Sequence, residues 1–188
     1  MFWRAYCSVF RLTFYAVDSH DRALRGTSTL TLTDPAGKAR SYTLSDGTFT
    51  DRLPGGSYKV DSCYYKGVSM PPLNVTEFVL DANEEERVAF PVYDVYLNVT
   101  KYFNHTCLIE GVEVYAKFPS PWGVQVAGTS SKTRPVVLSQ IPNGTLTVYL
   151  NATSSTPGFE ALVEERCVGW DVVEVVDSDV NASVRSFI

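Results

Sequence analysis

The sequence predicts an all-β fold made of two tandem antiparallel β-sandwiches, and three observations support this prediction. Apolar and polar residues alternate with a period of two along much of the chain, which is typical of strands with one buried and one solvated face. Turn residues separate these runs, mostly at intervals of about ten to fifteen residues. A turn-and-strand pattern at residues 53–60 returns at residues 141–148, which predicts a repeated unit.

The first half contains several strand and turn signals in order. An alternating run covers residues 10–17, and a second one places Leu30 and Leu32 between threonines. Pro, Gly and Asp predict turns at residues 34–37, 45–47, 54–56 and 71–72. The acidic segment 81–86 is the one helical candidate, and a charged loop fits it equally well.

The second half repeats the rhythm of the first. Alternating runs cover residues 95–100 and 146–151, and turns are expected at residues 119–121, 142–144 and 156–158. The segments 9–17 and 92–100 are both candidates for the first strand of a unit. We therefore expect two domains, 1–93 and 94–188. Because the boundary itself lies in a nearly continuous strand pattern, no flexible linker is predicted.

One segment carries a family resemblance. Asp46-Gly-Thr-Phe49 followed by Leu53-Pro-Gly-Gly-Ser-Tyr-Lys-Val60 resembles the recurring motif of carboxypeptidase regulatory-like domains, with slightly compressed spacing. The second half keeps only Ile141-Pro-Asn-Gly144 and the strand after it. The resemblance covers about sixty residues clearly, and it implies transthyretin-like or Ig-like sandwiches with accessory, adhesive or structural roles and no catalytic residues.

Composition excludes several classes of protein. The 188 residues are 45% apolar and carry a net charge of −5, so an ordinary globular chain is expected rather than a disordered one. The chain has no basic cluster, which argues against nucleic-acid binding. It also has no apolar run of about 18 residues, so no membrane-spanning segment is predicted.

Six of the seven asparagines begin Asn-X-Ser/Thr triplets, whereas chance would give about one. The excess predicts a heavily N-glycosylated protein that is extracellular or on the cell surface. The alternative is a threonine-rich β protein with accidental matches. The six candidate sites are Asn74, Asn98, Asn104, Asn143, Asn151 and Asn181.

The four cysteines agree with export. They are widely spaced, with no Cys-x-x-Cys pair, so they predict two disulfides rather than a zinc or redox site. Three connectivities are possible, and a two-domain chain favours Cys7–Cys63 and Cys107–Cys167. Four buried free thiols are the alternative. No signal peptide is visible, so an exported chain would be a mature form or part of a longer precursor.

The sequence contains no convincing catalytic or metal-binding motif. Asp18, Ser19 and His20 are neighbours in one turn, and such neighbours do not adopt the nested geometry of a catalytic triad. His105 lies inside a glycosylation triplet. Acidic residues at 18, 21 and 84–86 lack the spacing of a calcium loop. We therefore expect no enzyme activity, no cofactor and no metal.

Aromatic residues on outward strand faces are the remaining candidates for binding. The candidates expected on such faces are Tyr64, Tyr65, Tyr96 and Tyr149. They would stack on glycans or form a partner interface, or else simply shield the sheet.

These features predict a non-enzymatic structural subunit of a cell-surface assembly, a filament, pilus or surface layer, in which identical copies are the partners. The alternatives are a ligand-binding or adhesion module, or an accessory domain of a larger secreted protein. Residues 180–188 form an apolar alternating run, and Phe2, Trp3 and Tyr6 make the other end apolar. Assembly by β-strand donation is therefore predicted, unless the final strand completes its own sandwich.

Overall fold

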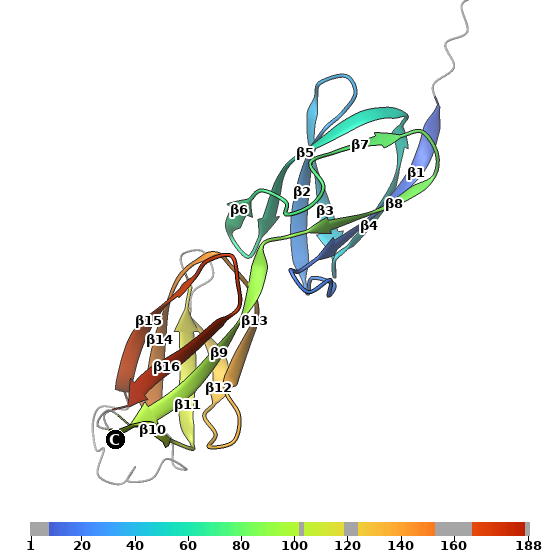
Figure 1. The fold of residues 1–188 in the computed structure, drawn as a ribbon. Helices are drawn as coiled ribbons and strands as arrows, with labels where there is room; N and C mark the ends of the chain where they lie inside the picture. The colour runs from blue at the N-terminus through green and yellow to red at the C-terminus, as the bar shows by residue number, and fades with distance from the viewer. Residues whose placement is uncertain (1–7, 102–103, 119–123, 153–166, 187–188) are drawn as a thin grey trace, which may run out of the picture. The chain divides into compact units, whose positions relative to one another are not determined.

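The computed structural model describes residues 8–101, 104–118, 124–152 and 167–186, and these residues form strands, turns and loops without a helix (Figure 1). No part of the described chain is therefore a helix that could cross a membrane. The chain divides into two compact units, residues 1–91 (unit 1) and residues 92–188 (unit 2). The division falls two residues before the boundary predicted at residue 93.

Unit 1 contains eight strands in one continuous sheet. Its strand order is β6-β5-β2-β3-β4-β1-β8, with β7 paired to β5. The strands are β1 (Val9–Val17), β2 (Thr27–Thr33), β3 (Ala39–Ser45), β4 (Thr48–Pro54), β5 (Gly56–Tyr65), β6 (Val68–Met70), β7 (Glu77–Leu80) and β8 (Glu84–Ala89). β3 and β4 pair where Ser45 faces Thr48, so the sheet folds over at this hairpin and its two parts become the layers of the sandwich.

The fold-over hairpin depends on a glycine. Asp46 and Gly47 both have positive φ, 47° and 74°, which is the conformation of a type I′ turn. The Gly47 carbonyl accepts a hydrogen bond from the Ala16 amide at 2.7 Å. A Cβ at Gly47 would lie 2.8 Å from the Ala16 carbonyl oxygen. The turn therefore requires glycine both for its φ and for the close approach of β1.

Aromatic residues join the two layers of unit 1. The ring of Phe14 in β1 meets that of Phe78 in β7 edge-on at 5.6 Å, and Phe78 stacks on Tyr58 in β5 at 5.3 Å. The Tyr58 hydroxyl donates a hydrogen bond to the Pro54 carbonyl at 2.8 Å, which fixes the Leu-Pro-Gly-Gly turn to the strand after it. The motif behind the family resemblance thus has a local structural role.

Unit 2 has two separate sheets. One contains β10-β9-β13 with β16 paired to β9, and the other has the order β12-β11-β14-β15. The strands are β9 (Val92–Lys101), β10 (Asn104–Leu108), β11 (Val112–Lys117), β12 (Val124–Thr129), β13 (Val136–Pro142), β14 (Gly144–Ala152), β15 (Cys167–Val175) and β16 (Val180–Ser186). The core between the sheets is aliphatic, with Val95, Leu97, Val114, Val148 and Val184 among its buried members.

The two units share a topology, which supports the repeat seen in the sequence. In unit 1 the first strand, β1, pairs antiparallel with β4 and parallel with the last strand, β8. In unit 2 the first strand, β9, pairs antiparallel with β13 and parallel with the last strand, β16. The repeated Pro-Gly turns join β4 to β5 and β13 to β14. The all-β prediction is confirmed, and each sandwich also contains one parallel pair that the sequence did not indicate.

One local prediction differs from the structure. The acidic segment 81–86, expected to be a helix or a loop, enters strand β8 at Glu84. β8 lies parallel to β1, with Leu12 beside Glu84. Main-chain pairing with a neighbouring strand therefore outweighs the local preference of glutamate for helix.

Candidate functional site

None of the six glycosylation candidates is buried. Three of these asparagine side chains are exposed, Asn74, Asn104 and Asn181, and three are half-buried, Asn98, Asn143 and Asn151. Strand alternation explains why Asn98 and Asn151 are not buried. Each follows a buried leucine, Leu97 or Leu150, and successive side chains in a strand point to opposite faces.

Several of these side chains also make hydrogen bonds. Asn74 bonds the main chain at the end of β8, donating to the Arg87 carbonyl at 2.9 Å and accepting from the Ala89 amide at 2.8 Å. Asn104 accepts a bond from the Thr106 hydroxyl, the third residue of its own triplet, at 2.8 Å. A glycosylated asparagine keeps its carbonyl oxygen and one N–H, so these bonds are compatible with a linked sugar.

Two candidates share the outer face of the β9–β16 pair. Asn98 lies beside Ser183, the third residue of the Asn181 triplet, and Asn181 lies beside Tyr96. The hydroxyl of Thr100, which completes the Asn98 triplet, is buried and has no hydrogen-bond partner. This face of unit 2 is therefore polar, and its two triplets are in contact.

The other outer face of unit 2 carries three aromatic side chains in one register. Tyr115 of β11 lies opposite Tyr149 of β14, and Tyr149 lies opposite Trp170 of β15. We call these three residues the aromatic row. The Cβ atoms of cross-strand partners are about 4.5–5.5 Å apart, so the three side chains start from neighbouring positions on this face.

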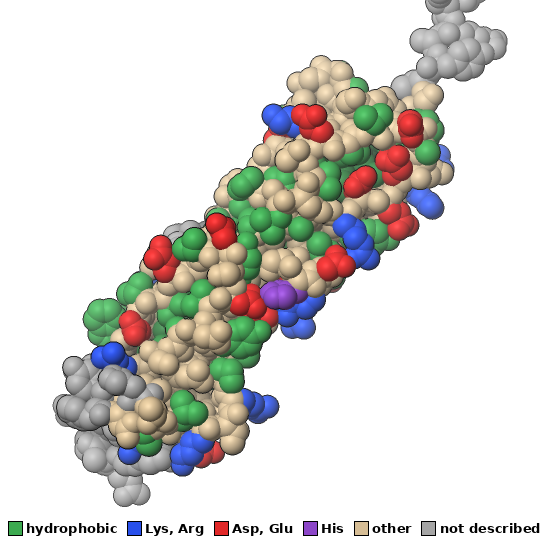
Figure 2. Space-filling view, in the orientation of Figure 1, with side chains coloured by type: hydrophobic (Ala, Val, Ile, Leu, Met, Phe, Trp, Pro, Cys, Tyr) green, Lys and Arg blue, Asp and Glu red, His purple; other side chains and the backbone are tan. Residues whose placement is uncertain are grey.

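Apolar side chains continue the aromatic row along β15 into the turn after it. Trp170 is 60% exposed, Val172 51% and Val176 58%. In Figure 2, hydrophobic side chains reach the surface along the edge of unit 2 where Figure 1 draws β15. Apolar patches of this kind on a protein surface usually contact a partner or a ligand.

The tyrosines singled out from the sequence have different environments. Tyr64 is 46% exposed, as predicted, and Tyr96 and Tyr149 are half-buried. Tyr65 is buried at 1% exposure, and its hydroxyl donates to the Arg25 carbonyl at 3.0 Å. Burial raises the pKa of Tyr65 to about 12. Its expected outward position is wrong because Tyr64 and Tyr65 are adjacent, and adjacent strand residues point to opposite faces.

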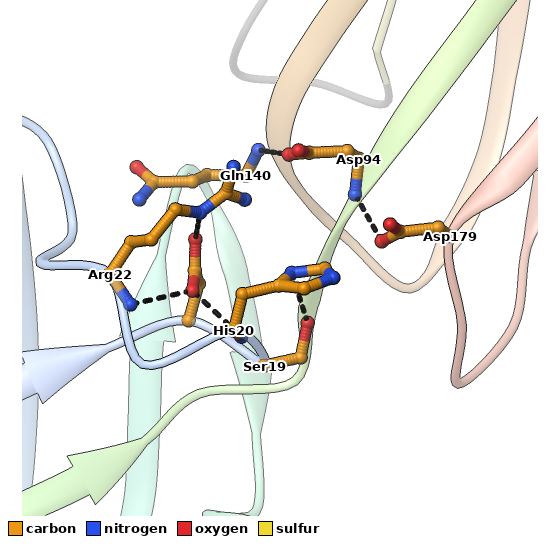
Figure 3. Close-up of polar contacts among 7 residues, drawn as sticks. Ser19, His20, Arg22, Asp94, Gln140 and Asp179 are labelled. Atoms are coloured by element: carbon orange, nitrogen blue, oxygen red, sulfur yellow. Dashed lines mark hydrogen bonds and ion pairs between the residues drawn. The ribbon is translucent and has the colours of Figure 1, made fainter.

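The turn formed by Asp18, Ser19 and His20 is held by hydrogen bonds to the Asp18 side chain (Figure 3). The Asp18 carboxylate accepts bonds from the main-chain amides of His20 and Arg22, at 2.9 and 3.0 Å, and from the Arg22 Nε at 2.7 Å. The Ser19 hydroxyl is 3.3 Å from the Nδ1 of His20. These carboxylate bonds hold the turn after β1, and they do not orient the imidazole for catalysis.

A second buried carboxylate, in unit 2, was not found from the sequence. Asp94 of β9 accepts a hydrogen bond from the Gln140 amide at 3.1 Å, and its own amide donates to Asp179 at 2.9 Å (Figure 3). Gln140 has a φ of 57° at an irregularity in β13. Asp94 therefore joins β9 to the bulge in β13 and to the turn before β16. Its one sequence signal is an aspartate inside an apolar run.

The cysteines are only partly described. Cys63 and Cys107 are free thiols in the structure, while Cys7 lies outside the described residues and the side chain of Cys167 is not described. Ser8 accepts a hydrogen bond from the Gly55 amide. Gly55 is eight residues, or about 26 Å of extended strand, from Cys63. A Cys7–Cys63 bridge needs Cα atoms within about 7 Å, so it would require the start of β1 to leave Gly55.

The second predicted bridge has a more favourable placement. Cys107 lies in β10, next to Leu108, which faces Thr100 of β9. Cys167 begins β15, two residues before Gly169, and Gly169 lies against the Arg185 carbonyl of β16. Arg185 in turn lies beside Thr100, the residue that Leu108 faces. The register thus brings Cys107 and Cys167 to the same end of unit 2. Both disulfides stay predictions.

Unit 1 has an open groove where β1 begins and β7 ends. Its volume is about 540 Å³, and it is lined by Ser8, Phe10, Gly55, Gly56, Val79, Leu80 and Asp81. Val79 is 58% exposed and Val9, which precedes Phe10, is 51% exposed. Among the described residues, no group of three acidic, histidine or cysteine side chains is placed to hold a metal ion.

The final strand belongs to its own sandwich. β16 pairs with β9 over seven residues, and Val184 is fully buried in the core of unit 2. The structure therefore agrees with the alternative stated from the sequence, in which residues 180–188 complete their own sandwich instead of being donated to another chain. A donated strand would have to come from another segment.

No protein-family model and no curated protein matches the sequence. Among solved structures, the chain is similar to a DUF3823 family protein from Bacteroides ovatus. The sequence identity is 16%, the match covers 96% of this chain and 100% of that chain, and the TM-score is 0.40. It is also similar to the shaft pilin SpaA from Lactobacillus rhamnosus GG. There the sequence identity is 10%, the match covers 95% of this chain and 98% of that chain, and the TM-score is 0.39.

A third similar structure is the TIE protein of Bacillus anthracis, at 12% identity, 95% of this chain and a TM-score of 0.39. The chain spans 34% of that protein, and it spans 26% and 62% of two other matched structures. At these values the similarity carries no argument about function, and membership in the carboxypeptidase regulatory-like family stays an expectation from the sequence.

Proposed function

We propose that this chain is a non-enzymatic extracellular glycoprotein that serves as a structural subunit of a cell-surface assembly, such as a filament, pilus or surface layer. The observation that carries the proposal is the position of the six Asn-X-Ser/Thr asparagines, all of which are exposed or half-buried on two β-sandwiches. Exposure makes all six asparagines accessible to a glycan, and their number, six of seven asparagines against about one by chance, is what favours glycosylation over accidental triplets.

The groove of unit 1 is the surface proposed for assembly. It is open and partly apolar, and it adjoins strand edges that offer main-chain hydrogen bonds. The chain supplies an occupant of matching chemistry in residues 1–7, which include Phe2, Trp3 and Tyr6. Insertion of this segment into the groove of a neighbouring copy gives a filament where each copy donates its segment to the next, because such a contact does not close on itself.

Electron microscopy of native material and light scattering of the purified chain test this proposal. The expected result is regular polymers for the wild-type chain, and monomers for the Phe2→Ser/Trp3→Ser/Tyr6→Ser variant and for Val79→Asp in the groove. Leu73→Asp is the matched control, because Leu73 is also an exposed apolar residue of unit 1, at 51% exposure, but does not line the groove. A wild-type chain that stays monomeric at all concentrations would refute the assembly role.

A specific observation favours a ligand-binding or adhesion module as the second candidate. The aromatic row places exposed Trp170 beside two half-buried tyrosines, and these residue types dominate binding hot spots. On this alternative the chain is monomeric and binds an external ligand, and Trp170→Ala abolishes binding. Binding of the wild-type chain to a panel of glycans or cell-surface proteins separates this candidate from the assembly role.

A further inference from the structure

We propose that the N-linked glycan of Asn151 folds back onto the aromatic row, so that the chain's own sugar covers the exposed apolar face of unit 2. The inference rests on the proposed glycoprotein character. It adds a carbohydrate-binding site made of Tyr149 and Trp170, with Glu113 as a polar neighbour.

Strand geometry brings the attachment point to the row. Asn151 and Tyr149 are two residues apart on β14, with buried Leu150 between them and buried Val148 before Tyr149. Residues separated by two positions point to the same face and are about 6.6 Å apart along the strand. Trp170 lies directly across from Tyr149. A sugar attached to the Asn151 amide therefore starts within one residue spacing of an aromatic ring.

The chemistry of the face suits a sugar. A pyranose ring has a face of C–H groups with positive partial charge, and an aromatic ring has a negatively charged face. Glu113 lies directly opposite Asn151 on β11, and its Oε2 accepts a bond from the Tyr115 hydroxyl at 2.6 Å. A carboxylate has about four acceptor positions, so Glu113 keeps acceptors for sugar hydroxyls.

Exposure supports the same conclusion. Trp170 is 60% exposed on a strand whose outward neighbour Val172 is 51% exposed. Leaving this much apolar surface in water is unfavourable, and a stacked glycan would cover it without a second protein.

The other candidate asparagines provide a comparison. Asn74 has Pro72 two residues before it, and Asn181 has Asp179, so neither has an aromatic neighbour at that position on its own strand. Asn98 has Tyr96 at this position, but its triplet ends in the buried hydroxyl of Thr100. Asn143 has Ile141 at this position, and Asn104 has Tyr102, which lies outside the described residues. Among the asparagines whose neighbours are described, Asn151 combines an aromatic neighbour with an exposed tryptophan across the strand.

A double-mutant cycle on the full glycosylated chain tests the inference. Glycopeptide mass spectrometry first measures the occupancy of each asparagine. The melting temperature of unit 2 is then compared for wild type, Asn151→Gln, Trp170→Ser and the double variant. We expect each single variant to lower the melting temperature by about 3–6 °C, and the double variant to lower it no further.

The matched control is the same cycle with Asn74→Gln, whose effect should simply add to that of Trp170→Ser. Occupied Asn151 with additive effects would overturn the stacking inference and leave the glycoprotein proposal intact. Asn151 unoccupied while other sites carry glycans would have the same consequence. A chain without any glycan would instead overturn the proposed function itself.

Discussion

Gly169 lies where the edges of the two sheets of unit 2 come closest. It is buried at the start of β15, and a Cβ built on it would overlap the Arg185 carbonyl oxygen of β16. The backbone at Gly169 does not have a positive φ. Glycine is therefore needed here for space and not for conformation.

We expect Gly169→Ala to destabilise unit 2 by about 1–3 kcal/mol, because β15 or β16 must move to admit the methyl group. Urea denaturation followed by circular dichroism measures the loss. Gly26→Ala is the comparison, since no atom lies within 4 Å of its Cβ and only its φ of 79° opposes alanine. That variant should lose about 1 kcal/mol. A Gly169→Ala chain as stable as wild type would contradict the close approach.

Cys63 shows how burial controls the chemistry of a single thiol. It is fully buried in β5, and desolvation raises its pKa to about 12. At pH 8 only about one thiol in ten thousand is then a thiolate, which is the reactive form.

We expect Cys63 to be unreactive toward a thiol reagent in the native chain. Unfolding in urea without reductant then distinguishes a free thiol, which reacts fully, from a disulfide. Mass spectrometry of the labelled peptides gives the result, and half-buried Cys107 is the internal comparison. If Cys63 stays unlabelled after unfolding, it is in a disulfide. A peptide map without reduction then identifies the partner, and a Cys7–Cys63 bridge would confirm the predicted pairing.

At the scale of elements, the last strand closes each sandwich by parallel pairing with the first. β16 alternates strictly, with Val184 in the core and Ser183 exposed. This pairing joins residues more than eighty positions apart, so the closing strand depends on the rest of the unit being folded.

We expect Val184→Asp to cost about 3 kcal/mol or more, because it buries a carboxylate without a partner in the aliphatic core. Ser183→Asp, one residue away on the outer face, should change the stability by less than about 0.5 kcal/mol. Both variants are compared in the unglycosylated chain, because Ser183 completes the Asn181 triplet. Thermal unfolding monitored by circular dichroism separates the two variants. Equal stability of the two would mean that β16 does not belong to this sandwich.

For the whole molecule, glycosylation is the property with the largest consequence. The bare chain has a mass of 20.8 kDa and a net charge of −5. Glycans on both outer faces of unit 2 would leave fewer surfaces for protein contacts, which is why the proposed assembly uses the groove in unit 1.

We expect at least four of the six candidate asparagines to carry glycans in native material, since none of the six is buried. Intact-mass analysis before and after enzymatic deglycosylation measures the number of sites. The protein expressed in a host without N-glycosylation provides the mass of the bare chain. A native mass of 20.8 kDa would refute the expectation.

The sequence by itself determined the features that depend on near neighbours. Alternation with a period of two identified the strands and their buried faces, since side-chain direction in a strand depends only on position along it. Asp46-Gly47 identified a tight hairpin, and the triplets and cysteines indicated export. For the same reason the alternation placed Asn98 and Asn151 on outward faces.

Only the tertiary structure decided the features that depend on register between distant strands. The aromatic row combines residues 115, 149 and 170 from three strands, and no local pattern connects them. Asp94 is buried because Gln140 and Asp179 supply its hydrogen bonds from elsewhere in unit 2. The strand character of β8 and the internal place of β16 likewise follow from parallel pairing, whose hydrogen bonds join residues that are far apart in the sequence.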